Sequence, residues 1–133
     1  MTTVIALIVV GPLVAAAAGL GARRHPRVRD PITVGTLSIV TALSVWLLVA
    51  VERDGSVVLR VGGWDPELGI VLVADLFAAL VLVVALATIL VVEIFALGQR
   101  GTPWGASPLV AGPTLLVLTA GVGLAVLTGD LFT

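Results

Sequence analysis

The chain contains four long runs of apolar residues, and these runs limit its fold more than any other feature. A helix needs about 20 mostly apolar residues to cross a hydrocarbon core of about 30 Å. Four segments meet this requirement, at residues 3–22, 32–51, 69–98 and 108–129. We therefore expect an all-α integral membrane protein with four transmembrane helices in a single membrane domain, residues 1–133. The third run would form the longest helix, which should tilt or extend beyond the lipid.

The composition agrees with a protein that is dissolved in lipid. Hydrophobic residues make up 59% of the chain and charged residues 11%, against roughly 45–50% and about 25% in soluble domains. The absence of cysteine excludes disulfides and thiolate chemistry. We find no catalytic triad, no phosphate-binding glycine loop and no metal-ligand spacing. We therefore expect neither an enzyme nor a bound cofactor or metal. The seven arginines form one short cluster plus three scattered residues, which does not indicate nucleic-acid binding.

Basic residues in the first connector predict the orientation in the membrane. The segment GARRHPRVRDP carries four arginines, and short loops rich in Lys and Arg stay in the cytoplasm. These topology residues are Arg23, Arg24, Arg27 and Arg29. The N-terminus should therefore lie outside, together with the loop at residues 52–68. Within that loop, SVVLRVGGW has a β-branched run before two glycines, which predicts a short strand or hairpin rather than coil.

Small residues at four-residue spacing occur in the first and fourth runs. They are Gly11, Ala15 and Gly19 in the first run, and Gly121, Ala125 and Gly129 in the fourth. Such residues let helix backbones approach closely in lipid, so we expect them at helix–helix contacts. The alternative is chance, because Gly and Ala are abundant in this chain.

Two carboxylates lie within the third apolar run, at Asp75 and Glu93. An acid at the bilayer centre costs at least about 2.5–3.5 kcal/mol, so such residues are candidates for function. One acid near each membrane surface would suit a proton route. The structural alternative is that Glu93 reaches the headgroups or pairs with Arg100, while Asp75 caps a helix, bonds a neighbouring helix or holds an arginine. Asp130, in the terminal LTGDLFT, is a third pathway candidate and should lie at the outer surface.

Three stretches together resemble one family. GGWDPELGIVLVADLFAALVLV is similar to the segment that leads into the third helix of the D subunit of the multisubunit sodium/proton (Mrp-type) antiporter. LIVVGPLVAAAAGL with the following Arg-rich loop resembles the first helix of that family, and LTGDLF resembles its junction between the fourth and fifth helices. Thr133 departs from the Asn that is common there. The same superfamily includes the antiporter-like subunits of respiratory complex I and of membrane-bound hydrogenases.

The resemblance implies exchange of a monovalent cation, Na⁺, for H⁺ by a hetero-oligomeric complex in a bacterial cell membrane. It implies that the chain corresponds to the first four helices of a longer subunit, which act mainly as scaffold and subunit contact. The family's principal proton-handling glutamate and lysines would lie beyond Thr133, whereas Asp75 matches an acid that recurs in the family. The competing interpretation is a small accessory subunit of an antiporter, complex I-like or hydrogenase complex. A free-standing channel ranks below both, because few runs offer polar residues.

Overall fold

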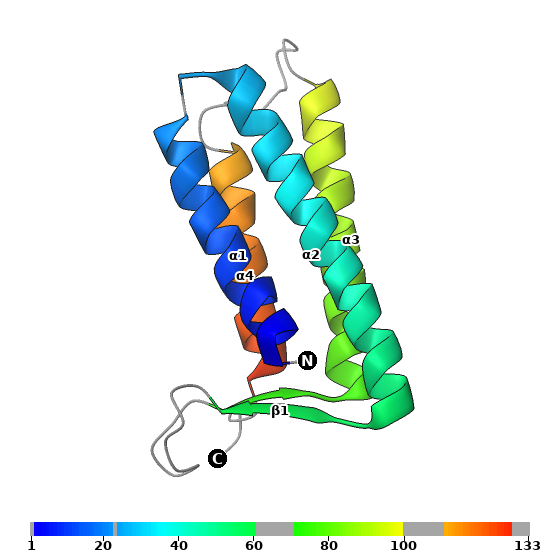
Figure 1. Cartoon of the computed structure of the whole chain (residues 1–133). Helices are drawn as coiled ribbons and strands as arrows, with labels where there is room; N and C mark the ends of the chain where they lie inside the picture. Colours follow the sequence, from blue (N-terminus) through cyan, green and yellow to red (C-terminus); the bar gives the residue numbers. More distant parts are fainter. Residues whose placement is uncertain (1, 23, 61–70, 100–110, 129–133) are drawn as a thin grey trace.

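The computed structural model describes residues 2–22, 24–60, 71–99 and 111–128. It contains helices α1 (Thr2–Gly21), α2 (Pro26–Asp54), α3 (Leu76–Gly98) and α4 (Ala111–Leu127), with strands β1 (Val57–Arg60) and β2 (Val71–Ala74) between α2 and α3. The four helices form a bundle in which α1 lies against α4 and α2 lies against α3 (Figure 1). The predicted all-α fold with four helices is confirmed.

Three of the helices are long and apolar enough to cross a membrane: α1, α2 and α3. The fourth, α4, has 17 residues, which corresponds to about 26 Å at 1.5 Å per residue. The longest helix is α2, with 29 residues, so the expectation that the third helix would be the longest is wrong. Helix α2 extends beyond the predicted span, residues 32–51, at both ends. It begins at Pro26, a position where the missing proline N–H costs no helical hydrogen bond.

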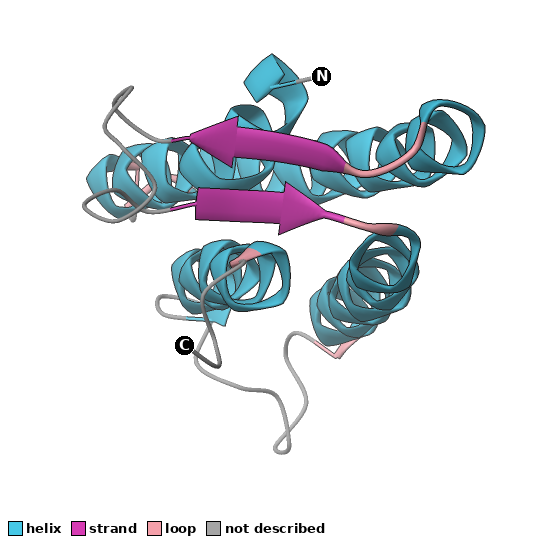
Figure 2. Ribbon diagram, turned by 90° about the horizontal axis from the view of Figure 1, so that it is seen from below, coloured by secondary structure: helices cyan, strands magenta, loops and turns pink. Residues whose placement is uncertain are grey.

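A two-stranded antiparallel sheet lies across one end of the bundle (Figure 2). Val57 pairs with Ala74 and Arg60 pairs with Val71. Gly55 ends α2 with a φ of 86°, and its N–H donates to the carbonyl of Val51 at 3.0 Å. A side chain rarely adopts this left-handed backbone, so glycine suits the turn into β1.

The predicted third span began too early, because residues 71–74 form β2 and not helix. The strand expected in the loop at residues 52–68 is present as β1, but its partner strand lies outside that loop. Leu72 of β2 is buried and also bridges to Thr128 after α4. The hairpin is therefore joined to the bundle through both α3 and α4.

The core is a continuous apolar cluster with contributions from all four helices and β2. Ile8, Leu37, Leu82 and Leu116 are almost completely buried. The outward faces are also apolar, and Phe77 is 76% exposed. Water does not tolerate such a continuous apolar surface, whereas lipid tails or neighbouring apolar helices do. Hydroxyl side chains of α2 bond back to their own helix, as in the 2.7 Å bond from Thr41 Oγ1 to the Leu37 carbonyl.

Candidate functional site

Arg29 is the largest fully buried side chain in the described part of the protein, with 1% of its surface exposed. It lies in the second turn of α2, one and two helical turns before the buried Thr33 and Leu37. This four-residue spacing places all three on the face that packs into the bundle. A Cβ atom added to Gly19 would lie 3.9 Å from Arg29 Cγ and 3.7 Å from Pro113 Cγ. The aliphatic part of Arg29 is therefore in contact distance of the end of α1, beside the start of α4.

The Arg29 guanidinium is held by the next residue in the chain. Its Nε and Nη2 donate to the same Asp30 oxygen, Oδ1, at 3.2 and 3.0 Å. The Asp30 side chain is 21% exposed, so this side of the ion pair is only partly buried. Thr33 Oγ1 donates to the Arg29 carbonyl at 3.2 Å. Two hydrogen bonds to one carboxylate oxygen leave other guanidinium N–H groups for further acceptors.

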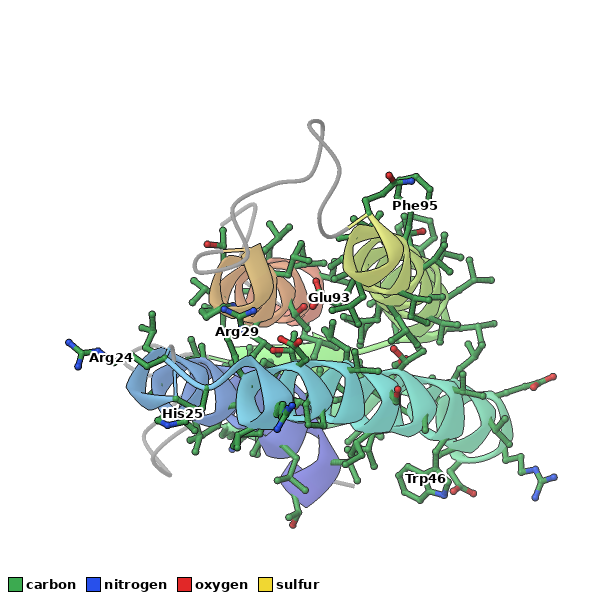
Figure 3. All side chains as sticks on the ribbon, turned by 90° about the horizontal axis from the view of Figure 1, so that it is seen from above. Arg24, His25, Arg29, Trp46, Glu93 and Phe95 are labelled. Atoms are coloured by element: carbon green, nitrogen blue, oxygen red, sulfur yellow. The ribbon has the colours of Figure 1, made fainter. Side chains whose placement is uncertain are left out.

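Glu93 reaches the same region from α3. It ends a buried stripe that includes Leu82, Leu86 and Ile89, so helical periodicity places its carboxylate on the packing face. Only 2% of Glu93 is exposed, and its Oε2 has no hydrogen-bond partner among the described residues. Seen along the bundle, Glu93 and Arg29 extend into the space between α2, α3 and α4 (Figure 3). The positive charge of Arg29 acts on the Glu93 carboxylate.

This charge cluster, defined as Arg29, Asp30 and Glu93, combines one guanidinium with two carboxylates. In α1 and α4 there is no charged residue, so neither helix adds a charge to it. A carboxylate oxygen without a partner in an apolar interior is unfavourable. The cluster can therefore accept a proton or another small positive charge. The described residues contain no group of three or more His, Cys, Asp or Glu side chains that could hold a metal ion.

The structure separates Asp75 from Glu93. Asp75 is exposed and serves as the N-cap of α3, where its Oδ1 accepts a 2.6 Å hydrogen bond from the Ala78 amide. It precedes α3, whereas Glu93 lies near the other end of that helix. The expectation that both acids lie inside one helix is wrong, and the capping alternative for Asp75 is confirmed. Asp130 lies outside the described residues, as does Arg100, the partner suggested for Glu93.

The predicted small-residue contacts are found in part. Ala15 packs against the core and Gly19 faces Pro113 and Arg29, but a Cβ atom at Gly11 would meet nothing within 4 Å. In α4, Gly121 and Ala125 are exposed, so they do not pack within the described bundle. Their contact with a helix elsewhere stays a prediction, and Gly129 lies outside the described residues.

The glycines of α4 that do make close contacts are Gly112 and Gly123, which the four-residue spacing missed. An added Cβ atom would lie 2.9 Å from Thr33 Oγ1 at Gly112, and 3.4 Å from Ile8 Cγ2 at Gly123. Their spacing of eleven residues corresponds to three helical turns and was a usable signal. These two glycines let α4 approach α2 and α1.

The four arginines assigned to topology also differ from one another. Arg24 and Arg27 are exposed. Arg27 and Arg29 belong to α2 rather than to a connector, and Arg29 is buried. Arg23 lies outside the described residues. Arg29 was therefore missed as a site residue, although its four-residue spacing from Thr33 and Leu37 marked the inner face.

Comparison with known proteins gives several matches that cover most of the chain. It is 39% identical over 90 residues to the D subunit of a Na⁺/H⁺ antiporter of Alkalihalophilus pseudofirmus, which covers 68% of this chain and 18% of that protein. It is 31% identical over 132 residues to a protein of Staphylococcus saprophyticus named for antiporter subunit mnhD2, which covers 99% of this chain and 26% of that protein. A Staphylococcus aureus protein of the same name is 29% identical over 110 residues, with coverage of 83% and 22%.

The chain thus spans about a quarter or less of the length of these curated relatives. No protein-family model matches it. The aligned residues nevertheless include nearly the whole chain, at identities of 29–39%. The resemblance found in the sequence is confirmed, and the chain is a homologue of the D subunits of the Na⁺/H⁺ antiporters.

Proposed function

We propose that the chain forms a membrane-embedded part of a cation/proton antiporter subunit in a bacterial cell membrane, and that the complete assembly exchanges Na⁺ for H⁺. The observation that carries this proposal is the alignment of 132 residues, 99% of the chain, with an antiporter subunit. Three helices with the length and composition of membrane spans support it. The N-terminus is proposed to lie outside, because the exposed Arg24 lies in the connector between the first two helices and the exposed Arg27 lies in the first turn of α2.

Within such an assembly, this part acts as scaffold and subunit contact. Ionisable residues are absent from α1, α4, the segment of α2 at residues 31–51 and the segment of α3 at residues 76–92. A proton relay through a bilayer requires a series of titratable groups or water-lined polar residues. The middle of the bundle offers no titratable group, so the transmembrane proton route is expected in other parts of the assembly.

The outward faces suit contact with lipid and with other subunits. On α3, Phe77, Val84, Val91 and Phe95 are all more than half exposed. Their spacing of seven or four residues places them along one side of the helix. Apolar faces of this kind lie in lipid or against neighbouring transmembrane helices, and the proposed partners are the other antiporter subunits, lipid, and the transported cations and protons.

Antiport in everted membrane vesicles tests the proposal. Vesicles would be prepared from antiporter-deficient cells that make the other subunits of the complex, either with or without this chain. Na⁺ would then be added to energised vesicles that contain a pH-sensitive dye. We expect Na⁺-dependent dequenching only when the chain is present. Equal dequenching in both preparations, with the remaining subunits present in equal amounts, would contradict the proposed function.

A substitution at Asp75 refines this test. Asn keeps a side-chain oxygen that can cap a helix, so Asp75→Asn removes the charge while retaining the cap. We expect this variant to reduce antiport if the charge belongs to an outer ion pathway. Asp54→Asn is the matched control, because Asp54 is also exposed and ends α2 just before β1, the strand that pairs with β2 in front of Asp75. Equal activity of both variants and the unsubstituted complex would leave Asp75 with the capping role alone.

A further inference from the structure

The charge cluster of Arg29, Asp30 and Glu93 has a net charge of −1 when both carboxylates are ionised, so one more positive charge would neutralise it. Glu93 is 2% exposed and Arg29 is 1% exposed, so water does not solvate either group in the bundle. With both carboxylates ionised, one guanidinium faces two negative charges. Burial of the excess charge is unfavourable unless it is neutralised.

The observed hydrogen bonds show how the single guanidinium is used. Arg29 donates twice to Asp30 Oδ1, at 3.2 and 3.0 Å, while Glu93 Oε2 has no partner among the described residues. The arrangement fits a neutral Glu93 beside an Arg29–Asp30 ion pair. An ionised Glu93 would instead compete with Asp30 for the guanidinium, because charge-assisted hydrogen bonds are stronger than neutral ones.

We propose that Glu93 is a proton-binding site, and that Arg29 pairs with Asp30 when Glu93 is protonated and is shared with Glu93 when the proton leaves. The step is a simple protonation, in which a carboxylate oxygen of Glu93 takes a proton from hydronium, so that one O–H bond forms, one O–H bond of hydronium breaks and a water molecule is released. The half-buried Asp30 provides the side of the cluster nearest to water, since its side chain is 21% exposed.

The groups packed around Glu93 support a proton over a metal cation. From α2, Arg29 lies beside Glu93 and is paired with Asp30, and α1 and α4 contain no charged residue. A metal ion would need several oxygen ligands around it, and the described residues form no group of three or more such side chains. The inference concerns proton binding by the protein itself, so its test does not depend on antiport.

Infrared difference spectroscopy of the reconstituted full-length protein tests this inference. A protonated carboxyl group gives a C=O stretching band that a carboxylate lacks. We expect the unsubstituted protein to show the band of a buried carboxylic acid, and Glu93→Gln to lose it completely. Glu52→Gln is the matched control, because Glu52 is exposed at the opposite end of α2, and this substitution should leave the band unchanged. A band that survives in Glu93→Gln would overturn the proposal.

Two further measurements separate proton binding from a purely structural ion pair. Glutamine has the shape and neutrality of a protonated glutamic acid, so Glu93→Gln should fold and melt like the unsubstituted protein. A loss of folding would show that the negative charge is required and would overturn the proposal. Asp30→Asn should leave Arg29 to pair with Glu93 and weaken the carboxylic-acid band at constant pH, whereas an unchanged band would refute the sharing of Arg29.

Discussion

The close approach of α4 to α2 should be highly sensitive to one added methyl group. In Gly112→Ala the new Cβ atom would lie 2.9 Å from Thr33 Oγ1, 3.4 Å from its Cγ2 and 3.7 Å from its Cβ. Thr33 is 1% exposed and its hydroxyl donates to the Arg29 carbonyl. Because β-branched side chains are stiff at χ1, Thr33 cannot move aside without losing this bond or shifting the helix.

The size of the effect follows from two opposing contributions. Overpacking a well-packed site costs about 1–3 kcal/mol, while replacing a helical glycine by alanine gains about 0.5–1 kcal/mol. We therefore expect Gly112→Ala to destabilise the protein by about 1–2 kcal/mol. Gly121→Ala is the matched control in the same helix, because its Cβ atom would meet nothing within 4 Å. This control should have unchanged or slightly higher stability.

Thermal unfolding in detergent, followed by circular dichroism at one scan rate, would rank the variants even if unfolding is irreversible. The double substitution Gly112→Ala with Thr33→Ala removes the Thr33 Oγ1 and Cγ2 atoms that the new Cβ atom would meet. The double variant should therefore be more stable than the summed stability changes of the two single variants predict. A favourable coupling of about 1–2 kcal/mol is expected for residues in direct contact. The contact argument would be refuted by a Gly112→Ala midpoint equal to that of Gly121→Ala, or by additive effects in the double variant.

Two other predictions concern the membrane orientation and the start of α3. Reporter fusions at Gly55 and Gly101 should report outside and inside, respectively, because basic connectors remain in the cytoplasm; the opposite pattern would overturn the proposed topology. Asp75→Ala removes the acceptor of the 2.6 Å bond from the Ala78 amide and should destabilise the protein by about 1 kcal/mol. Asp75→Asn should lose less, and equal midpoints for Ala and Asp at this position in thermal unfolding would contradict the capping role.

Hydropathy predicted the number of helices and the bounds of α1 within a residue, since a long apolar run has few alternatives to a helix. It misplaced the start of α3, because the run GIVLVA is as apolar as the helix that follows. Short apolar β-branched runs fit a buried strand as well as a helix. Asp75 was a local signal for the true start of α3, because aspartate favours the N-cap position and is followed here by the leucine and alanine residues of the helix. The pairing of β2 with β1 was beyond this pattern, because it depends on contacts between distant segments.

The charge cluster could be predicted only in part from the sequence. Glu93 was identified as an unusual acid because it lies in an apolar run, but Arg29 was interpreted only as one of four connector arginines. Extending the helical pattern of α2 back from Leu37 and Thr33 by four residues leads to Arg29. That extension predicts a buried face but no partner, since the sequence does not say that α3 lies beside α2.

The acidic residues at the two ends of the bundle have different surroundings. At the hairpin end, Asp75 accepts a hydrogen bond from a backbone amide at the start of α3 and remains exposed. At the other end, Asp30 lies near the start of α2, where the positive end of the helix dipole favours a negative charge. Arg29 then has a charged partner close to water, and Glu93 is the acid left in the apolar interior. If the charge cluster binds a proton, the positions of Asp30 and Glu93 therefore assign that proton to Glu93.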